Sequence, residues 1–382
     1  MKVIQVCIGK FHHFDLARQL SRRDMLQVIF TGYPGWKLRN EGLRPGQIST
    51  FPWVQAPYMG LARWGGLGSS WRKNLSWLAQ ETLDHHAARN LPEADWLMAI
   101  SASGLHCGKA AKSRGMRVIC DRGSSHIRFQ QRILSEEYRS YGEVFDGVDP
   151  RILDKEEAEY ANADLITIPS EFALDSFIEM GVPREKLRKV PYGVDLTRFA
   201  KTGEPDRESF DVLYVGQVNL RKGIRYLLDA FARLKHPRKR LTVVGQIAPE
   251  VSRYLARNPP ADECRFLGHM PQEQLKDIMS RSHVMVLPSV EEGLALVQAQ
   301  ALACGCPVIA TRNTGASDLF EDGDCGFIVE PRNETTIAER LQQLADDESL
   351  RTKMSAAALT QVGRFGGWDQ YGNLMADIFS SR

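Results

Sequence analysis

The chain has no long hydrophobic run. None approaches the roughly 18 apolar residues of a membrane-spanning helix, so no transmembrane segment is expected. The 49 basic and 47 acidic residues leave a formal net charge of +2, which does not favour a nucleic-acid-binding protein. The apolar stretch after Lys2, VIQVCI, is too short and too strand-like for a signal peptide. Walker loops, HExxH motifs, internal repeats and low-complexity tracts are also absent.

Cysteine is scarce and scattered. The seven cysteines are an odd number, and they are scattered without the regular spacing of a disulfide-bonded domain. Both features favour a protein of the reducing cytoplasm. Cys304 and Cys306 flank Gly305 and could form a redox or metal pair. They lie at a predicted helix–turn–strand junction with no histidine nearby in sequence, so we expect them to be structural.

The length of 382 residues suggests two or three domains at about 150 residues each. Predicted strands and helices alternate from residue 3 onward, and a second such series begins at the strand 211–216. The polar segment 196–209, with charges of both signs, is the predicted linker. This pattern indicates an α/β fold with parallel sheets, whose ligands bind at the carboxyl ends of the strands.

The stretch from Val284 to Gly315 contains the most informative pattern in the chain. An apolar strand ends near Leu287 and is followed by an acidic loop, a helix predicted over 294–304 and a second strand after residue 307. Glu292 in the loop and Gln300 in the helix are eight residues apart, or about 12 Å along a helix. That span approaches the reach of a nucleotide sugar, and a helix N-terminus between them suits a diphosphate. The alternative is an ordinary βαβ unit with solvated acids.

A second anion site is predicted at the loop from Gly216 to Gly223. It carries Arg221 and Lys222 directly before a predicted helix, which favours phosphate binding over a merely solvated loop. Asp322 and Asp324 could mimic a metal-binding DxD motif. They lie in a turn before a strand, so no metal is expected there.

In the first half, polar residues follow two predicted strands. The loop after the first strand holds four candidates for the acceptor side of a site: Gly9, His12, His13 and Asp15. The strand 117–120 is followed by two more candidate site residues, Asp121 and His126. Helix caps or surface positions are the alternative for each of them, with Ser124 or Asp121 as the cap of the following helix.

Residues 33–92 are the least regular part, and we expect a loop-heavy functional insertion there. Residues 1–80 hold eleven Lys and Arg against three acids, an excess of eight positive charges. Six of the seven tryptophans precede residue 100: Trp36, Trp53, Trp64, Trp71, Trp77 and Trp96. Such a surface suits an anionic membrane interface or an amphiphilic acceptor, and core tryptophans beside a solvated basic face are the alternative.

The second half resembles the retaining GT-B glycosyltransferases of family four (glycosyl transferases group 1). The resemblance rests on VGQVNLRKGIRYLLDAF, LTVVG, FLGHMPQEQL and VLPSVEEGLALVQAQALACGCPVIAT, with VPYGVD at 190–195 similar to the family's linker motif. It implies two Rossmann-like domains facing across a cleft, with no divalent metal or other cofactor. The implied domains are 1–197, joined by a returning C-terminal helix at 367–382, and 198–366.

The resemblance also implies roles for individual residues. Lys222 would hold the donor diphosphate with Arg221 as a helper, and Glu292 would contact the donor sugar and support positive charge at the anomeric carbon. The diphosphate would also lie near Gly216, Gln217 and the amides of Ala295, Leu296 and Val297. The base would lie against His269 and Met270. The family's first-domain histidine corresponds to Asp121, so His126 or Asp121 would take its catalytic place.

Two residues depart from the family pattern. Gln300 stands where the family has the acid that holds the ribose, and Gln217 stands where it has a diphosphate arginine. Gln300 can still accept one hydrogen bond but loses charge assistance worth about 1 kcal/mol, and Gln217 removes one cation, so looser donor binding is expected.

The expected function is a metal-independent, hexosyltransferase-type enzyme with a nucleotide-sugar donor. Its acceptor would be a glycan, a lipid-linked sugar or a small molecule, in polysaccharide or glycolipid biosynthesis. The expected location is the cytoplasm or the cytoplasmic membrane face. A non-catalytic sugar-nucleotide-binding member and a sugar-nucleotide epimerase are the alternatives.

Overall fold

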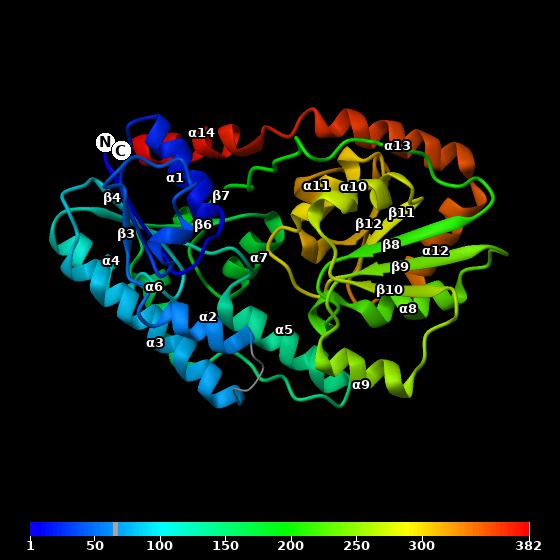
Figure 1. The fold of residues 1–382 in the computed structure, drawn as a ribbon, viewed down its shortest axis with the longest axis horizontal. Helices are drawn as coiled ribbons and strands as arrows, with labels where there is room; N and C mark the ends of the chain where they lie inside the picture. The colour runs from blue at the N-terminus through cyan, green and yellow to red at the C-terminus, as the bar shows by residue number, and fades with distance from the viewer. Residues whose placement is uncertain (64–67, 382) are drawn as a thin grey trace.

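The computed structural model describes residues 1–63 and 68–381, and it contains two parallel sheets, each flanked by helices (Figure 1). The expected α/β fold with two Rossmann-like domains is confirmed. The sheet of the first domain has the strand order β3 (Ile48–Thr50), β2 (Leu26–Thr31), β1 (Val3–Cys7), β4 (Trp96–Ile100), β5 (Arg117–Asp121), β6 (Leu165–Ile168) and β7 (Leu187–Lys189). Strands such as β1 are buried along their whole length, as parallel strands covered on both faces are.

The helices of the first domain connect these strands. They are α1 (His12–Arg22), α2 (Gln55–Arg63), α3 (Ser69–Arg89), α4 (Leu105–Ser113), α5 (Ile127–Ser140), α6 (Pro150–Asn162) and α7 (Glu171–Glu179). The expectation of a loop-heavy segment over 33–92 is wrong for residues 55–63 and 69–89, which form α2 and α3. Ala79, Leu83 and Ala87 are buried four residues apart on α3, and this spacing was the helical signal in the sequence.

The second domain begins after the linker. Its sheet has the order β10 (Cys264–Gly268), β9 (Lys239–Val244), β8 (Phe210–Val215), β11 (Val284–Leu287), β12 (Val308–Thr311) and β13 (Gly326–Val329). Its helices are α8 (Ile224–Arg233), α9 (Pro249–Arg257), α10 (Gln272–Ser280), α11 (Leu296–Ala303), α12 (Glu334–Asp346) and α13 (Glu348–Val362). One apolar core, which includes Tyr214 and Phe231, fills this domain.

The chain returns to the first domain at its C-terminal end. The last helix, α14 (Gly367–Ser380), packs against α1, and the two chain ends lie close together (Figure 1). Tyr371, Met375 and Phe379 lie four residues apart and are buried in the core of the first domain. Trp96 Nε1 donates a hydrogen bond to the carbonyl of Phe379 at 2.9 Å. Packing of one helical face therefore fastens α14 to the first domain.

The junction of Cys304, Gly305 and Cys306 terminates α11. Gly305 has a φ of +70°, its N–H donates to Leu302 O, and the N–H of Cys306 donates to Ala301 O, which together form a Schellman cap. Both cysteines are free thiols. Asp322 accepts a hydrogen bond from the N–H of Ile328 at 2.8 Å and so closes the turn before β13.

Within residues 1–63 and 68–381, no helix is long and apolar enough to cross a membrane. Residue 197 lies between β7 and β8, and α14 begins at Gly367, while the expected domain bounds stay a prediction.

Removing the Phe379 ring should destabilise the protein, because the ring is 1% exposed in the first core. We expect Phe379→Ala to lower the free energy of unfolding by about 3–5 kcal/mol in urea denaturation. Leu374→Ala, on the exposed side of the same helix, is the control and should cost about 0.5 kcal/mol or less. Equal losses in the two variants would contradict the packing of α14 described above.

Candidate functional site

Loops from the carboxyl ends of both sheets meet where the two domains face each other. After β8, the chain turns through Gly216 into a short helical turn, Leu220–Lys222, that precedes α8. A Cβ at Gly223 would lie 2.0 Å from the carbonyl oxygen of Pro288, and Gly223 has a φ of +68°, so only glycine fits there. This close contact holds the basic loop against the segment that follows β11.

Lys222 and Glu292 form an ion pair at this place. Their side chains are 16% and 18% exposed, so the pair lies mostly out of water but open to one side. Asn219 accepts a hydrogen bond from the N–H of Lys222 at 3.0 Å and fixes the turn that directs the lysine. Ser289 donates to Glu292 at 3.3 Å. The two residues expected to hold the diphosphate and the donor sugar are therefore neighbours.

Glu291, the residue beside Glu292, joins the two domains. It accepts hydrogen bonds from Ser124 at 2.6 Å and from the hydroxyl of Ser125 at 2.7 Å, both in the first domain. Gln130 on α5 donates a third at 2.9 Å. From the second domain, Arg221 Nε lies 2.8 Å from the Glu291 carboxylate. The carboxylate thus takes donors from both domains while its side chain is 0% exposed.

The charge of Glu291 is stabilised by these partners. Burial alone would raise the pKa of Glu291, but Arg221 and the hydrogen bonds from Gln130 and the two serines outweigh burial and lower it to about 2. Sequence reasoning missed this residue, because Glu291 and Glu292 look alike there as acids of one loop. The related signal in the sequence is Gly293, because a glycine permits a close approach of another backbone. In the structure, a Cβ at Gly293 would lie 2.0 Å from the carbonyl oxygen of Gly123.

Helix α11 begins at Leu296, two residues after the predicted start at Leu294. The N–H of Ala295 donates to Thr314 O at 3.0 Å, so this amide already has an acceptor. Leu296 and Val297 occupy the first turn, and Gln300 lies half-buried on the same helix. Their roles toward a donor stay predictions, with Leu296 and Val297 the better placed amides.

The remaining donor-side candidates lie on the neighbouring strand ends. Gln217 is exposed, and its carbonyl accepts a hydrogen bond from the hydroxyl of Tyr214 at 2.7 Å. The exposed His269 and the half-buried Met270 follow β10, which is joined to the end of β9 by the hydrogen bond from Gly245 N to Gly268 O. The predicted base-binding segment therefore lies two strands away from the Lys222 loop.

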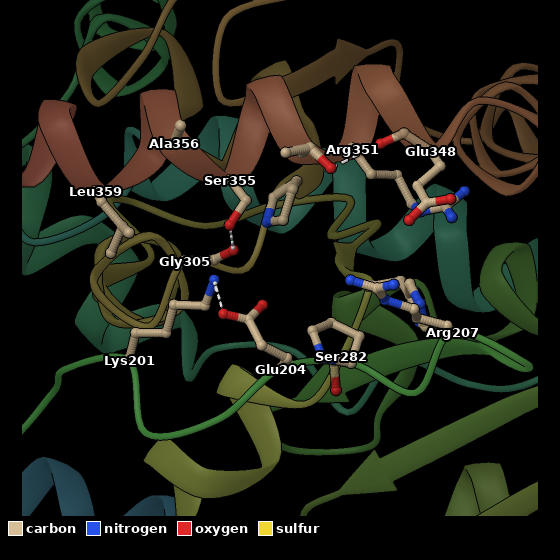
Figure 2. A pocket seen from close by; sticks show the side chains of 14 residues that line it. Lys201, Glu204, Arg207, Ser282, Gly305, Glu348, Arg351, Ser355, Ala356 and Leu359 are labelled. Atoms are coloured by element: carbon tan, nitrogen blue, oxygen red, sulfur yellow. Dashed lines mark hydrogen bonds and ion pairs between the residues drawn. The ribbon is translucent and has the colours of Figure 1, made fainter.

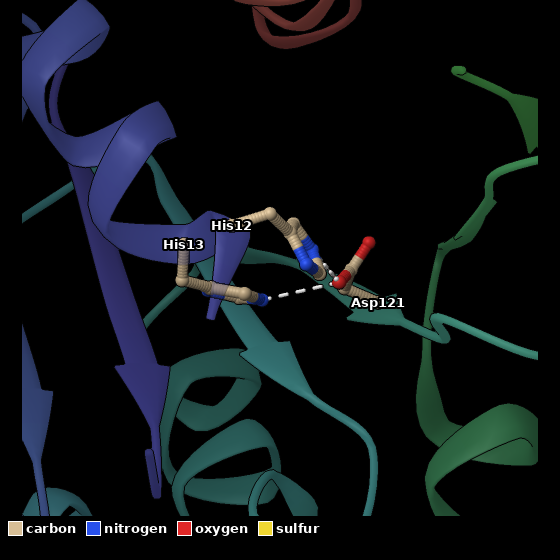
Figure 3. Close-up of side chains that lie close together, drawn as sticks. All are labelled: His12, His13 and Asp121. Atoms are coloured by element: carbon tan, nitrogen blue, oxygen red, sulfur yellow. Dashed lines mark hydrogen bonds and ion pairs between the residues drawn. The ribbon is translucent and has the colours of Figure 1, made fainter. Parts of the chain in front are cut away.

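Three first-domain candidates meet at the end of β5 (Figure 3). His12 Nε2 lies 2.7 Å and His13 Nε2 3.1 Å from the same oxygen of Asp121. Thr167 donates to the other oxygen at 2.6 Å. Burial would raise the pKa of Asp121, but the two histidines outweigh it and hold that pKa well below its usual range. Desolvation lowers the pKa of His13.

His126, Asp15 and Gly9 lie outside this cluster. His126 is buried against Tyr160 and Phe177 and caps α5, because its Nδ1 accepts a hydrogen bond from the N–H of Arg128 at 3.2 Å. Capping was the alternative expected for this position, and the catalytic role of His126 stays a prediction. Asp15 pairs with Arg18 on its own helix. The carbonyl of Gly9 accepts from Cys7 Sγ at 3.0 Å.

A separate cavity of about 370 Å³ lies between the linker and α13 (Figure 2). Lys201 and Glu204 form an ion pair there, and Ser355 donates to the carbonyl of Gly305. This cavity contains none of the candidate residues.

The second half of the chain is similar to known proteins. Residues 197–361 match the family model of glycosyl transferases group 1. The chain is 29% identical over 241 residues to the D-inositol 3-phosphate glycosyltransferase of Corynebacterium kroppenstedtii, covering 57% of this chain and 53% of that one. It is 31% identical over 240 residues to the enzyme of the same name from Streptomyces avermitilis, covering 57% and 51%. The matches thus span about half the length of these relatives.

Two solved structures resemble the whole chain. Anabaena Alr3699/HepE in complex with UDP and glucose has a TM-score of 0.70 at 18% identity, covering 100% of both chains. Sucrose-phosphate synthase from Thermosynechococcus elongatus has a TM-score of 0.69 at 18% identity, covering 99% of this chain and 98% of that one. These likenesses concern the fold, and they confirm the expected GT-B architecture.

Replacing Glu291 with glutamine should weaken the contact between the domains. We expect Glu291→Gln to lower the free energy of unfolding by about 1.5–3 kcal/mol at pH 7, the worth of a hydrogen bond to a charged group. The folded pKa of about 2 lies below the ordinary 4.5, so the charge stabilises the fold fully above pH 4.5 and loses this effect as the pH falls toward 2.

Urea denaturation of both proteins between pH 7 and pH 3 measures this difference. Glu330→Gln, which removes an exposed ion pair with Arg312, is the control and should change little. A gap between wild type and Glu291→Gln that stays constant across this pH range would contradict the interpretation.

Proposed function

We propose that this protein is a retaining glycosyltransferase with a nucleotide-sugar donor, because residues 197–361 match the family model of glycosyl transferases group 1. The ion pair of Lys222 and Glu292 is the observation that carries this proposal. It brings an ammonium group and a carboxylate together at the carboxyl ends of neighbouring strands, and we propose that the first binds a diphosphate and the second faces the sugar. Ligands of open α/β sheets bind at such strand ends.

The reaction would follow from these two charges. In the donor complex, the diphosphate takes the place of Glu292 at the ammonium group of Lys222, which then neutralises the leaving group. Glu292 faces the sugar and stabilises positive charge at the anomeric carbon. The bond from that carbon to the diphosphate breaks, the acceptor oxygen bonds to the same face, and the leaving phosphate takes the acceptor's proton.

The donor we propose is a nucleoside diphosphate sugar held without a metal ion. Lys222 and the first-turn amides of α11 supply positive charge at the diphosphate. A UDP-sugar is the first donor to test, since the solved Anabaena protein with this fold is in complex with UDP and glucose. Gln300 and Gln217 in place of charged residues would loosen donor binding without changing the two groups at the reacting bond.

The acceptor we propose is amphiphilic, a lipid-linked sugar or a polysaccharide precursor at the membrane face. Trp36 and Trp53 are 65% and 76% exposed and line one groove, where Lys37 lies 5.0 Å from the ring of Trp36. Exposed tryptophans beside cations suit an anionic lipid interface. Trp96 is a core residue, as the alternative expected, and Trp64 lies outside the described residues.

A non-catalytic member that only binds sugar nucleotides is the second candidate. The two glutamines, Gln217 and Gln300, favour it, because each removes a charge that the family pattern places at the donor. Such a protein would bind the donor and release no nucleotide with any acceptor.

Variants of the central ion pair test the enzyme directly. We expect Lys222→Ala and Glu292→Gln each to lower the turnover of a UDP-, GDP-, ADP- or dTDP-sugar by about 10²–10³-fold, the usual effect of removing one charge-stabilising group. Release of free nucleotide, in buffer with and without a chelator, is the measurement.

Gln300→Glu is the matched control, because it changes the same site without touching the reacting bond, and its rate should stay near that of wild type. Wild-type turnover in either ion-pair variant would overturn the residue assignment. Donor binding without turnover across an acceptor panel would favour the binding-only protein.

Liposome flotation tests the membrane contact. The protein should float with vesicles containing anionic lipid at low salt and be released at high salt, because screening weakens attraction between surface charges. Trp53→Ala should reduce the fraction of protein that floats. Trp77→Ala is the control and should leave that fraction unchanged, because the Trp77 ring is half-buried and packs on Arg151. No binding at low salt would refute this part of the proposal.

A further inference from the structure

The cluster of His12, His13 and Asp121 contains a buried carboxylate that forms no ion pair with a lysine or arginine in the part of the chain that the structure describes. Asp121 is 2% exposed, and its ion-pair partners within the described residues are the two histidines. A buried carboxylate needs a cation or a metal ion to offset its desolvation. Either a protonated histidine or a bound metal ion can supply that positive charge here.

The donor atoms converge as metal ligands do. The Nε2 atoms of both histidines and one oxygen of Asp121 all lie within 4.8 Å of one another. The three side chains come from the first turn of α1 and the end of β5 and point toward one another (Figure 3). Two imidazole nitrogens and one carboxylate oxygen are a donor set for Zn²⁺ and similar transition ions, whereas Mg²⁺ and Ca²⁺ prefer oxygen ligands.

The groups behind the ligands independently fit a metal site. Gln5 and His13 lie in contact, with Gln5 Nε2 3.4 Å from His13 Nδ1, while the buried Oε1 of Gln5 has no hydrogen-bond partner. Rotating the Gln5 amide by half a turn would let Oε1 accept a hydrogen bond from Nδ1–H of His13. His13 Nε2 would then present its lone pair to a metal, and Thr167 would orient Asp121.

We propose that His12, His13 and Asp121 bind one divalent transition-metal ion of the Zn²⁺ type. Three protein ligands leave a fourth position for water or a hydroxyl group. Of the three ligands, His12 is the one that reaches solvent, because its side chain is 11% exposed. The centres of the His12 and Tyr192 rings are 4.2 Å apart. This site belongs to the first domain and is distinct from the donor diphosphate, where we propose no metal.

A second cluster in the first domain offers a matched control. Glu81, His85 and His106 also bring three ligand atoms within 4.8 Å. There, however, Lys155 lies 2.7 Å from the Glu81 carboxylate and already supplies positive charge. The ring of His85 is 49% exposed. In this cluster the carboxylate therefore already has a lysine partner, unlike Asp121, whose ion-pair partners among the described residues are histidines.

Titration of the chelator-treated, full-length protein with Co²⁺ tests the site. We expect one equivalent to bind with visible d–d absorption and to be displaced by Zn²⁺. His12→Gln should weaken Co²⁺ binding at least 100-fold, whereas His106→Gln should leave it unchanged. Thermal unfolding of each variant checks that it is folded. The readout needs no nucleotide sugar, so it is independent of the proposed glycosyl transfer.

Gln5→Leu is the second variant, because it keeps all three ligands and removes only the acceptor behind His13. It should weaken Co²⁺ binding about 10–100-fold, the usual effect of losing such a partner. A simple hydrogen-bonded pair of histidines on Asp121 would bind no Co²⁺. Absence of one-equivalent binding, or equal losses in His12→Gln and His106→Gln, would overturn the proposal.

Discussion

The buried carboxylate of Glu291 is the interaction on which the arrangement of the two domains depends. It accepts hydrogen bonds from Ser124, Ser125 and Gln130 of the first domain and pairs with Arg221 of the second. A buried charge is tolerated only when its partners are in place, so these contacts permit a narrow range of domain positions. Neighbouring Glu292 and the Lys222 loop are positioned by the same segment.

Much of the fold could be predicted from the sequence, because parallel strands covered on both faces appear as continuous apolar runs. β1, β8 and β11 are examples, and the family motifs in the second half added the order of the elements. The long helix α3 was missed. Tryptophans and charges obscure its apolar positions, and only the spacing of Ala79, Leu83 and Ala87 indicates it.

The site could be predicted only in part. Lys222 and Glu292 lie in motifs whose local structure determines where they point, and the structure brings them together. Glu291 and the cluster on Asp121 depend on contacts between residues more than 100 positions apart, which one sequence does not reveal. His126 is a further case in which the sequence leaves two roles open, since a histidine after a strand suggests chemistry while the structure shows it as a helix cap.

The two neighbouring carboxylates Glu291 and Glu292 take their positive partners from the same place. Glu291 and Glu292 both pair with residues of one short turn, Arg221 and Lys222, which is also the proposed seat of the diphosphate. A donor that engages this turn therefore competes with both pairs, one holding the domains and one beside the sugar. Donor binding and the contact between the domains are then coupled. The donor changes the equilibrium constant of the domain contact by the same factor by which the domain contact changes the donor's binding constant.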